Sequence, residues 1–230
     1  MSEKWTYRSR ALVAASLLAA AAGARAEPAA AASAAGQGLL AAARAGDTTA
    51  VNEWLKRGAP VDVADDQGDT PLLLATRANH AEVAQALLSH GADPNRKNLM
   101  QDSAYLLAGA SGRLEILRMS LSHGADLKST NRYGGTALIP ACERGHVQVV
   151  KTLIAAGVDI NHVNRLGWTC LLEAVLLSDG GPRHQDIVRQ LIAAGADVDL
   201  ADRDGMTALA HARQRGQTQI VKLLSAAGAH

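Results

Sequence analysis

Residues 65–72 read Asp-Asp-Gln-Gly-Asp-Thr-Pro-Leu, a polar turn that runs directly into a helix start. Proline is tolerated at the first helical position, and a threonine before it can cap the free amides of the first turn. Val83, Leu87 and Leu88 then follow at helical spacing, which indicates a second helix with one buried face. The segment predicts a turn and two helices, the second of which ends at Gly91.

The same pattern recurs along the chain. Gly-Ala or Gly-Val pairs follow one another at steps of 33, 33, 33, 38 and 33 residues, and they begin at Gly58, Gly91, Gly124, Gly157, Gly195 and Gly228. A second series keeps the same period and the same five-residue surplus: Thr70, Ser103, Thr136, Thr169 and Thr207. Two independent markers with one period indicate a repeat protein, in which stacking buries the apolar face that no single unit can bury.

These residues resemble the ankyrin repeat, whose pattern is Asp-x-x-Gly-x-Thr-Pro-Leu, a helix ending near Gly-His, a Val- and Leu-rich second helix, and Gly-Ala-Asp. The best matches are residues 65–72, 145–150 and 91–93, and the resemblance covers residues 37–230. It implies an all-α repeat solenoid of six stacked helix–turn–helix units with β-hairpin fingers, at about 37–69, 70–102, 103–135, 136–168, 169–206 and 207–230. The chain looks like the small exported bacterial type of this family.

Three units depart from the pattern. The first lacks Thr-Pro-Leu and has Trp54 at a Leu position, so it resembles an N-terminal cap, and the polar segment 213–215 gives the last unit a polar outer end. In the third unit Gln101 replaces the finger glycine, Tyr105 replaces a leucine, and Ser120 stands in the apolar stripe. An unbonded serine hydroxyl there costs ~1–3 kcal/mol, so we expect the solenoid to open most easily at this unit.

Residues 1–26 have the layout of a secretory signal peptide. Lys4, Arg8 and Arg10 precede an apolar run over residues 11–23, and Ala24-Arg25-Ala26 supplies a small-x-small cleavage site. The run is shorter than the roughly 20 residues that span a bilayer, although a retained membrane anchor is the alternative. Residues 27–36 read as an Ala-rich tether, and 37–230 as the repeat domain.

The overall charge excludes a broadly basic nucleic-acid binder. The 230 residues carry a formal charge of +1, and 48% are hydrophobic but only 3% aromatic, with no Phe. Loss of residues 1–26 removes four basic residues and one acidic residue, which leaves nineteen basic and twenty-one acidic residues and a net charge of about −2. We predict no nucleic-acid partner, no membrane contact after signal cleavage, and a monomer.

Motifs of enzymes and metal sites are absent from the sequence. It contains no Gly-x-Ser-x-Gly elbow, no phosphate loop and no His-Glu-x-x-His pair. His80 and His146 fall on the Gly-His turn of the resembled family, and His90 and His123 precede turn glycines, so these histidines follow the repeat. We predict that the chain is not an enzyme and has no catalytic residues, no cofactor and no metal site.

Cys142 and Cys170 are the two cysteines. They occupy different positions of neighbouring units, which suggests Cα atoms too far apart for a disulfide. We expect two separate buried thiols, with a disulfide in an oxidising compartment as the alternative.

The fingers carry the candidate partner-binding residues. In ankyrin-like stacks the finger tips and the exposed positions of the first helices form a concave binding surface. Tips are normally polar, yet apolar and arginine residues fill them here: Leu99, Met100, Arg132, Tyr133, Arg165, Leu166, Trp168, Arg203 and Met206. Trp, Tyr and Arg are enriched at interface hot spots, which favours a partner site. The alternative is that these side chains fold back against neighbouring fingers or helix starts.

The resemblance implies a non-catalytic protein–protein interaction module. Small exported bacterial ankyrin proteins support periplasmic enzymes such as catalases, and others act as immunity or effector-type proteins that neutralise or target a foreign protein; the residues do not choose between these. We expect export to the periplasm of a Gram-negative bacterium, with secretion into another cell as an alternative. The surplus at residues 178–182 is either a neutral loop extension or a partner contact.

Overall fold

The structure, a computed structural model, describes residues 34–230. These residues form twelve α-helices, and no β-strand is assigned among them. The helices are α1 (Ala34–Ala45), α2 (Thr48–Lys56), α3 (Pro71–Ala78), α4 (Ala81–Ser89), α5 (Ala104–Ala110), α6 (Leu114–Ser122), α7 (Leu138–Glu143), α8 (Val147–Ala155), α9 (Cys170–Leu176), α10 (Pro182–Ala193), α11 (Ala208–Gln214) and α12 (Thr218–Ala226).

The predicted signal peptide, residues 1–26, lies outside the described residues, as do residues 27–33 of the predicted tether. Helix α1 begins at Ala34, so the last three residues of that tether are helical.

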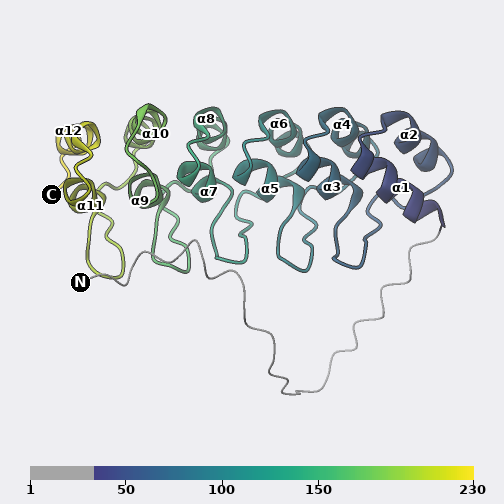
Figure 1. Cartoon of the computed structure of the whole chain (residues 1–230), viewed down its shortest axis with the longest axis horizontal. Helices are drawn as coiled ribbons and strands as arrows, with labels where there is room; N and C mark the ends of the chain where they lie inside the picture. The colour runs from purple at the N-terminus through teal and green to yellow at the C-terminus, as the bar shows by residue number, and fades with distance from the viewer. Residues whose placement is uncertain (1–33) are drawn as a thin grey trace, which may run out of the picture. The chain divides into compact units, whose positions relative to one another are not determined.

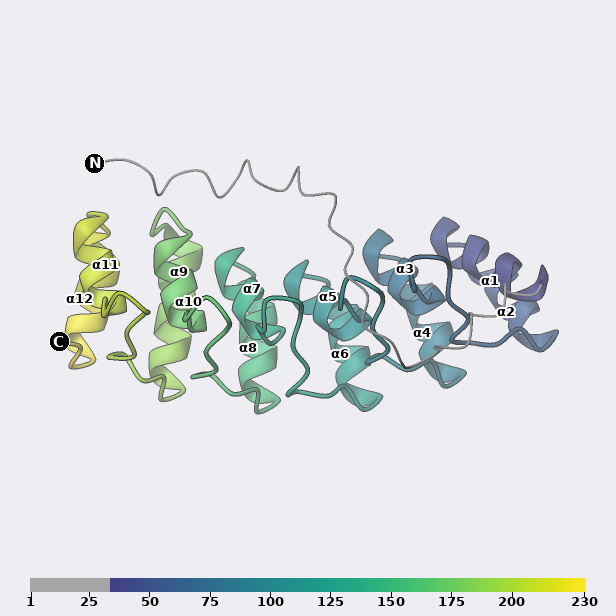
Figure 2. The ribbon, with the colours of Figure 1, turned by 90° about the horizontal axis from the view of Figure 1, so that it is seen from below.

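The helices form two rows. Odd-numbered helices line up in one row and even-numbered helices in the other (Figure 1), and consecutive pairs follow one another in chain order (Figure 2). Five loops connect one pair to the next and project from the odd-numbered row, whose members we call the inner helices; the even-numbered helices are the outer helices. We call these loops fingers 1 to 5: residues 57–70, 90–103, 123–137, 156–169 and 194–207. The predicted all-α solenoid is confirmed.

Hydroxyl caps start most of the inner helices, as residues 65–72 predict. The Thr70 hydroxyl oxygen accepts a hydrogen bond from the Leu73 N–H at 3.2 Å, and Ser103, Thr169 and Thr207 cap their helices in the same way. Thr136 is the exception. Its hydroxyl is buried without a hydrogen-bond partner among the described residues, and α7 begins one residue late, at Leu138.

Small residues allow the inner helices to approach one another closely. The recurring alanine of each inner helix is completely buried: Ala75, Ala108, Ala141, Ala174 and Ala212. Contact between successive inner helices is staggered, because the late part of one helix packs against the beginning of the next. A Cβ placed on Gly109 of α5 would lie only 2.8 Å from the Cβ of Ala137, directly before α7. Only glycine leaves room for that approach.

The same stagger joins the two cysteines. Cys142 in α7 and Cys170, the first residue of α9, form a disulfide with their Cα atoms 5.6 Å apart. These residues are the equivalents, 33 positions later, of Gly109 and Ala137. The prediction of two separate thiols is therefore wrong. It compared equivalent positions of neighbouring units, whereas the nearest positions are those that the stagger brings together.

The third helix pair is less disrupted than its sequence suggests. The buried Ser120 hydroxyl donates a hydrogen bond to the Ile116 carbonyl at 2.8 Å, so its hydrogen-bonding capacity is satisfied. The contacts of the third pair with the next pair are nevertheless small. Among the consecutive inner helices described, α5 and α7 make the least extensive contact, and among the outer helices α6 and α8 do. The contact between α7 and α9, which the disulfide bridges, is the most extensive among the inner helices.

The five-residue surplus lies partly inside a helix. Helix α10 begins at Pro182 and has 12 residues, whereas the other outer helices have 9. The remaining loop is held by the last helix pair, because the Gln217 side-chain amide donates to the carbonyls of Val175 and Ser178. The surplus thus extends a helix as well as a loop.

Removal of the disulfide should destabilise the domain. The cysteines are 28 residues apart, and closing a loop of that length restricts the unfolded chain by about 3–4 kcal/mol. We expect urea unfolding of the wild type to shift to lower urea by a corresponding amount on reduction, and C142A/C170A to unfold like the reduced wild type with no response to reductant. Two titratable thiols in the unreduced protein would contradict the bridge.

Tyr105 should tolerate replacement by phenylalanine. Its side chain is completely buried, and its hydroxyl has no hydrogen-bond partner among the described residues. Because an unsatisfied buried hydroxyl is costly, we expect Tyr105→Phe to raise the free energy of unfolding by about 1 kcal/mol. Tyr105→Ala, which leaves a cavity, should lower it by about 3–5 kcal/mol. Thermal and urea unfolding check both; a destabilised Phe variant would mean that the hydroxyl is bonded, for example to water.

Candidate functional site

An aspartate or asparagine side chain closes each finger. In finger 2 the Asn98 side-chain oxygen accepts hydrogen bonds from the N–H groups of Met100 and Asp102, at 2.9 Å each. The Asn98 N–H in turn donates to the Asp102 carbonyl. The same arrangement recurs at Asp65, Asn131, Asn164 and Asp202. These side-chain bonds and the main-chain bond together close each finger. No strand is assigned in the fingers of residues 34–230, so the predicted β-hairpins are not confirmed.

The two residues after each closing side chain form the tip of the finger. From finger 1 to finger 5 these are Asp66 and Gln67, Leu99 and Met100, Arg132 and Tyr133, Arg165 and Leu166, and Arg203 and Asp204. In finger 2 the backbone of Gln101 has a φ of 62°, where the other fingers have glycine. The finger therefore keeps the common loop shape even though its glycine is missing.

The predicted partner-binding residues fall into two groups. Leu99, Met100 and Tyr133 are 71%, 52% and 44% exposed, and they are among the most exposed large apolar side chains described. Arg132, Arg165 and Arg203 are exposed as well. By contrast, the three others are half-buried: Leu166, Trp168 and Met206. Trp168 packs against the core, so for this residue the alternative expectation, that the side chain folds back, is what the structure has.

Arginine side chains join the tips of fingers 3 to 5. Arg165 donates to the carbonyl of Arg132 at 3.0 Å, and Arg203 donates to the carbonyl of Arg165. Each arginine stem lies over a glycine of the preceding finger, since a Cβ on Gly134 would be 2.8 Å from Arg165 Cγ and one on Gly167 would be 2.7 Å from Arg203 Cγ. We call the exposed set Leu99, Met100, Arg132, Tyr133, Arg165 and Arg203 the tip row.

The guanidinium group of Arg132 lies 4.8 Å from the centre of the Tyr133 ring and 3.6 Å from the Asp102 carboxylate. These contacts link the tip of finger 3 to Asp102 of finger 2.

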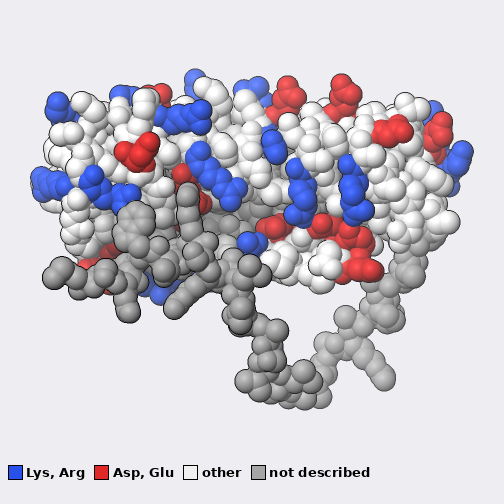
Figure 3. Space-filling model, in the orientation of Figure 1, with Lys and Arg blue, Asp and Glu red and all other residues white. Residues whose placement is uncertain are grey.

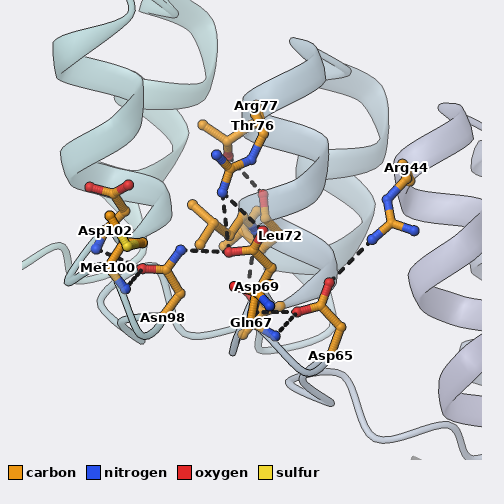
Figure 4. A network of polar contacts seen from close by, with 12 residues as sticks. Arg44, Asp65, Gln67, Asp69, Leu72, Thr76, Arg77, Asn98, Met100 and Asp102 are labelled. Atoms are coloured by element: carbon orange, nitrogen blue, oxygen red, sulfur yellow. Dashed lines mark hydrogen bonds and ion pairs between the residues drawn. The ribbon is translucent and has the colours of Figure 1, made fainter. Parts of the chain in front are cut away.

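Two carboxylates of finger 1 are paired with arginines of the inner helices. Arg44 reaches Asp65 at 3.2 Å, and Arg77 reaches Asp69 at 2.9 Å. The Asn98 amide donates to the same Asp69 carboxylate at 2.6 Å, and Figure 4 shows this chain of contacts running from α1 to finger 2. The acidic atoms that gather over these fingers in Figure 3 therefore belong in part to a neutralised network.

Known ankyrin repeats match nearly the whole of this pattern. A family model of three ankyrin repeats matches residues 28–98 and 104–202, and a second model, of many ankyrin repeats, matches residues 182–224. The chain belongs to the ankyrin-repeat family.

Solved ankyrin structures agree in length as well as in fold. An ankyrin repeat domain from Acinetobacter baumannii is 57% identical, covers 84% of this chain and 98% of its own length, and has a TM-score of 0.82. The ankyrin repeat protein EF0377 is 47% identical over 83% of this chain and 97% of its own, with a TM-score of 0.80. The ankyrin repeat domain of Bcl-3, a member of the IkappaB family, is 29% identical over 84% and 86%, with a TM-score of 0.75. No curated protein sequence matches the chain.

Ankyrin repeats are protein–protein interaction modules and generally non-enzymatic scaffolds, and this ankyrin domain is an interaction module. Across residues 34–230, no helix combines the length and apolar character needed to cross a membrane, and no group of three or more His, Cys, Asp or Glu could hold a metal ion.

Sequence reasoning missed two features of the ankyrin fingers. Val163 is 49% exposed, and it precedes its closing residue at a position where the other fingers have Ala64, Lys97, Thr130 and Ala201. Glu173 of α9 is buried at the position of Leu74, Leu107, Pro140 and His211. In both cases the sequence signal was a residue whose chemical type differs from that of the residues at the same position in the other units.

Glu173 ties finger 4 to its inner helix. The Asn164 amide donates to Glu173 Oε1 at 2.9 Å. Burial, aided by the negative charge of Glu143, raises the pKa of Glu173 from the usual 4.5 to about 8. The side chain is therefore a neutral acid at neutral pH, and the finger is anchored without a buried negative charge. In finger 5, Asp202 and His211 form the equivalent contact at 2.8 Å.

Glu173→Gln should change how stability depends on pH. Because the folded pKa lies above the unfolded one, the folded state holds an extra proton between about pH 4.5 and 8, and stability falls as pH rises through this window. Glutamine keeps the oxygen that Asn164 binds and cannot ionise. We expect equal melting temperatures at pH 4.5 and a variant that is progressively more stable up to pH 9. Glu115→Gln, an exposed change on α6, is the control, and parallel pH profiles of Glu173→Gln and wild type would contradict the assignment.

Proposed function

We propose that this protein is an exported ankyrin module of six units, capped at both ends, that holds a protein partner on the tip row and the adjoining surface of the inner helices. It acts as a non-catalytic monomer in the cell envelope, in the periplasm of a Gram-negative bacterium.

The exposed apolar cluster on fingers 2 and 3 carries this proposal. Leu99, Met100 and Tyr133 present large apolar side chains to solvent at adjacent tips, where loops normally place polar residues. Adjacent exposed apolar groups mark interaction sites. The closing hydrogen bonds and the arginine links hold these tips in fixed positions, which lowers the ordering cost of binding.

Two features support export. Residues 1–26 have the layout of a signal peptide, and Cys142 is joined to Cys170 by a disulfide. Disulfides persist in oxidising compartments such as the periplasm and are rare in the cytosol.

The proposed partner is a periplasmic enzyme that the module supports, such as a catalase. This choice rests on the resemblance to small exported bacterial ankyrin proteins. In an immunity or effector role, the same surface would bind a foreign protein.

Photo-crosslinking in the envelope tests the binding surface. A photoreactive amino acid at position 99 or 133 should yield a crosslink to one protein, whereas the same group at Leu177 should not. Leu177 is a matched control because it is also an exposed leucine, at 40%, but follows α9 away from the tips.

Expression of the full chain in a Gram-negative host tests export in the same cells. We expect a periplasmic protein that begins at Glu27, and unchanged melting of the position-99 variant. Crosslinks at 177 equal to those at 99, or an uncleaved cytoplasmic protein, would contradict the corresponding part of the proposal.

A further inference from the structure

The character of the tips changes along the row of fingers. Finger 1 ends in the acidic residue Asp66, finger 2 in Leu99 and Met100, and finger 3 in Arg132 and Tyr133. Finger 4 then presents Arg165 and finger 5 Arg203, both exposed. The surface thus runs from acidic through apolar to basic, in chain order.

The basic end has capacity for a carboxylate. Within residues 34–230, neither Arg165 nor Arg203 is paired with a carboxylate, and each donates instead to a main-chain carbonyl of the preceding finger. A guanidinium group has five N–H donors in a planar fork and binds carboxylates with two parallel hydrogen bonds. The links to the backbone orient the two forks and use only part of this capacity. By contrast, three carboxylates of fingers 1 and 2 already have arginine partners: Asp65 with Arg44, Asp69 with Arg77, and Asp102 with Arg132.

The spacing of the tips suits an extended chain. Main-chain bonds join neighbouring tips directly: the Leu99 N–H donates to the Gln67 carbonyl, and the Arg165 N–H donates to the Tyr133 carbonyl. Consecutive tips are thus separated by about the 8–10 Å of packed helices. An extended chain advances about 3.3 Å per residue, so about three of its residues cover one finger.

We propose that the tip row binds an extended acidic segment of a protein, which places an apolar side chain against Leu99, Met100 and Tyr133 and carboxylates against Arg165 and Arg203. This inference rests on the proposed function and names the chemistry of the partner. The order of the fingers sets the direction, because Asp66 repels the acidic end of the segment from finger 1. Carboxylates about three and six residues from the apolar anchor would meet fingers 4 and 5. Asp204, beside Arg203 on the tip of finger 5, opposes binding of the last carboxylate.

Selection from a random peptide library tests this chemistry. The probe is a phage-displayed library of peptides about twelve residues long, enough to cross four fingers, selected on the purified protein with its disulfide intact. We expect enriched peptides to combine a leucine or aromatic residue with several carboxylates. The best of these is then made synthetically with a fluorescent label, and its affinity is measured by anisotropy.

Four variants separate charge from packing. R165E/R203E should weaken binding of the peptide by at least about tenfold, because close charge pairs become repulsive. R165K/R203K keeps the charge but loses the planar fork, so it should bind more tightly than R165E/R203E and more weakly than the wild type. D204N should bind about two- to fivefold more tightly, since it removes the opposing charge. R118E makes one such charge change at an exposed residue of the outer helix α6, away from the fingers and the inner helices, and it should have no effect.

Some negative results would contradict only the inferred chemistry of the partner, and others would also contradict the proposed binding surface. Enriched peptides that are neutral or basic, or acidic peptides that bind R165E/R203E as well as wild type, would overturn the inferred chemistry but leave the proposed binding surface intact. Peptides whose affinity is unchanged by the double substitution L99S/Y133S would place binding elsewhere and overturn the surface as well. Circular dichroism of each variant shows that the comparison is between folded proteins, and a library without enrichment counts against both proposals.

Discussion

The apolar face of each helix pair can be buried only by the next pair, and this requires the inner helices to approach one another closely. Alanine and glycine supply the room, since the recurring alanine of each inner helix is completely buried and Gly109 faces Ala137 with no space for a side chain. Because neighbouring pairs repeat this contact along the row, they also fix the position of every finger. The low aromatic content, 3% of the chain, reflects the same constraint, since rings would hold the helices apart.

The fingers then keep one shape while their tips vary. A single aspartate or asparagine closes each loop through its own side chain, so the side chains of the next two residues are not needed to close the loop. This explains why neighbouring fingers can carry residues as different as Asp66, Met100 and Arg165 without a change in backbone. The proposed binding site lies at these tip positions, where side chains can differ without a change in the shape of the loop.

Sequence periodicity was sufficient to predict the helix pairs, their caps and the exposed tips at Leu99, Met100 and Tyr133. It failed where contacts depend on how one unit is set against the next. The pairing of Cys142 with Cys170 follows from the stagger of the inner helices, which no spacing along the chain reveals. Trp168, the last residue but one of finger 4, packs against the core, whereas Leu99, Met100 and Tyr133 at the tips are exposed.

The disulfide also makes one junction of the solenoid different from the others. It links α7 to α9, whose contact is the most extensive among the inner helices described, whereas α5 meets α7 and α6 meets α8 through smaller contacts. Finger 2 precedes the junction between the third and fourth helix pairs, and finger 4 follows it. We therefore expect bending of the domain to be greatest at this junction, where it would alter the distance from Leu99 and Met100 to Arg165.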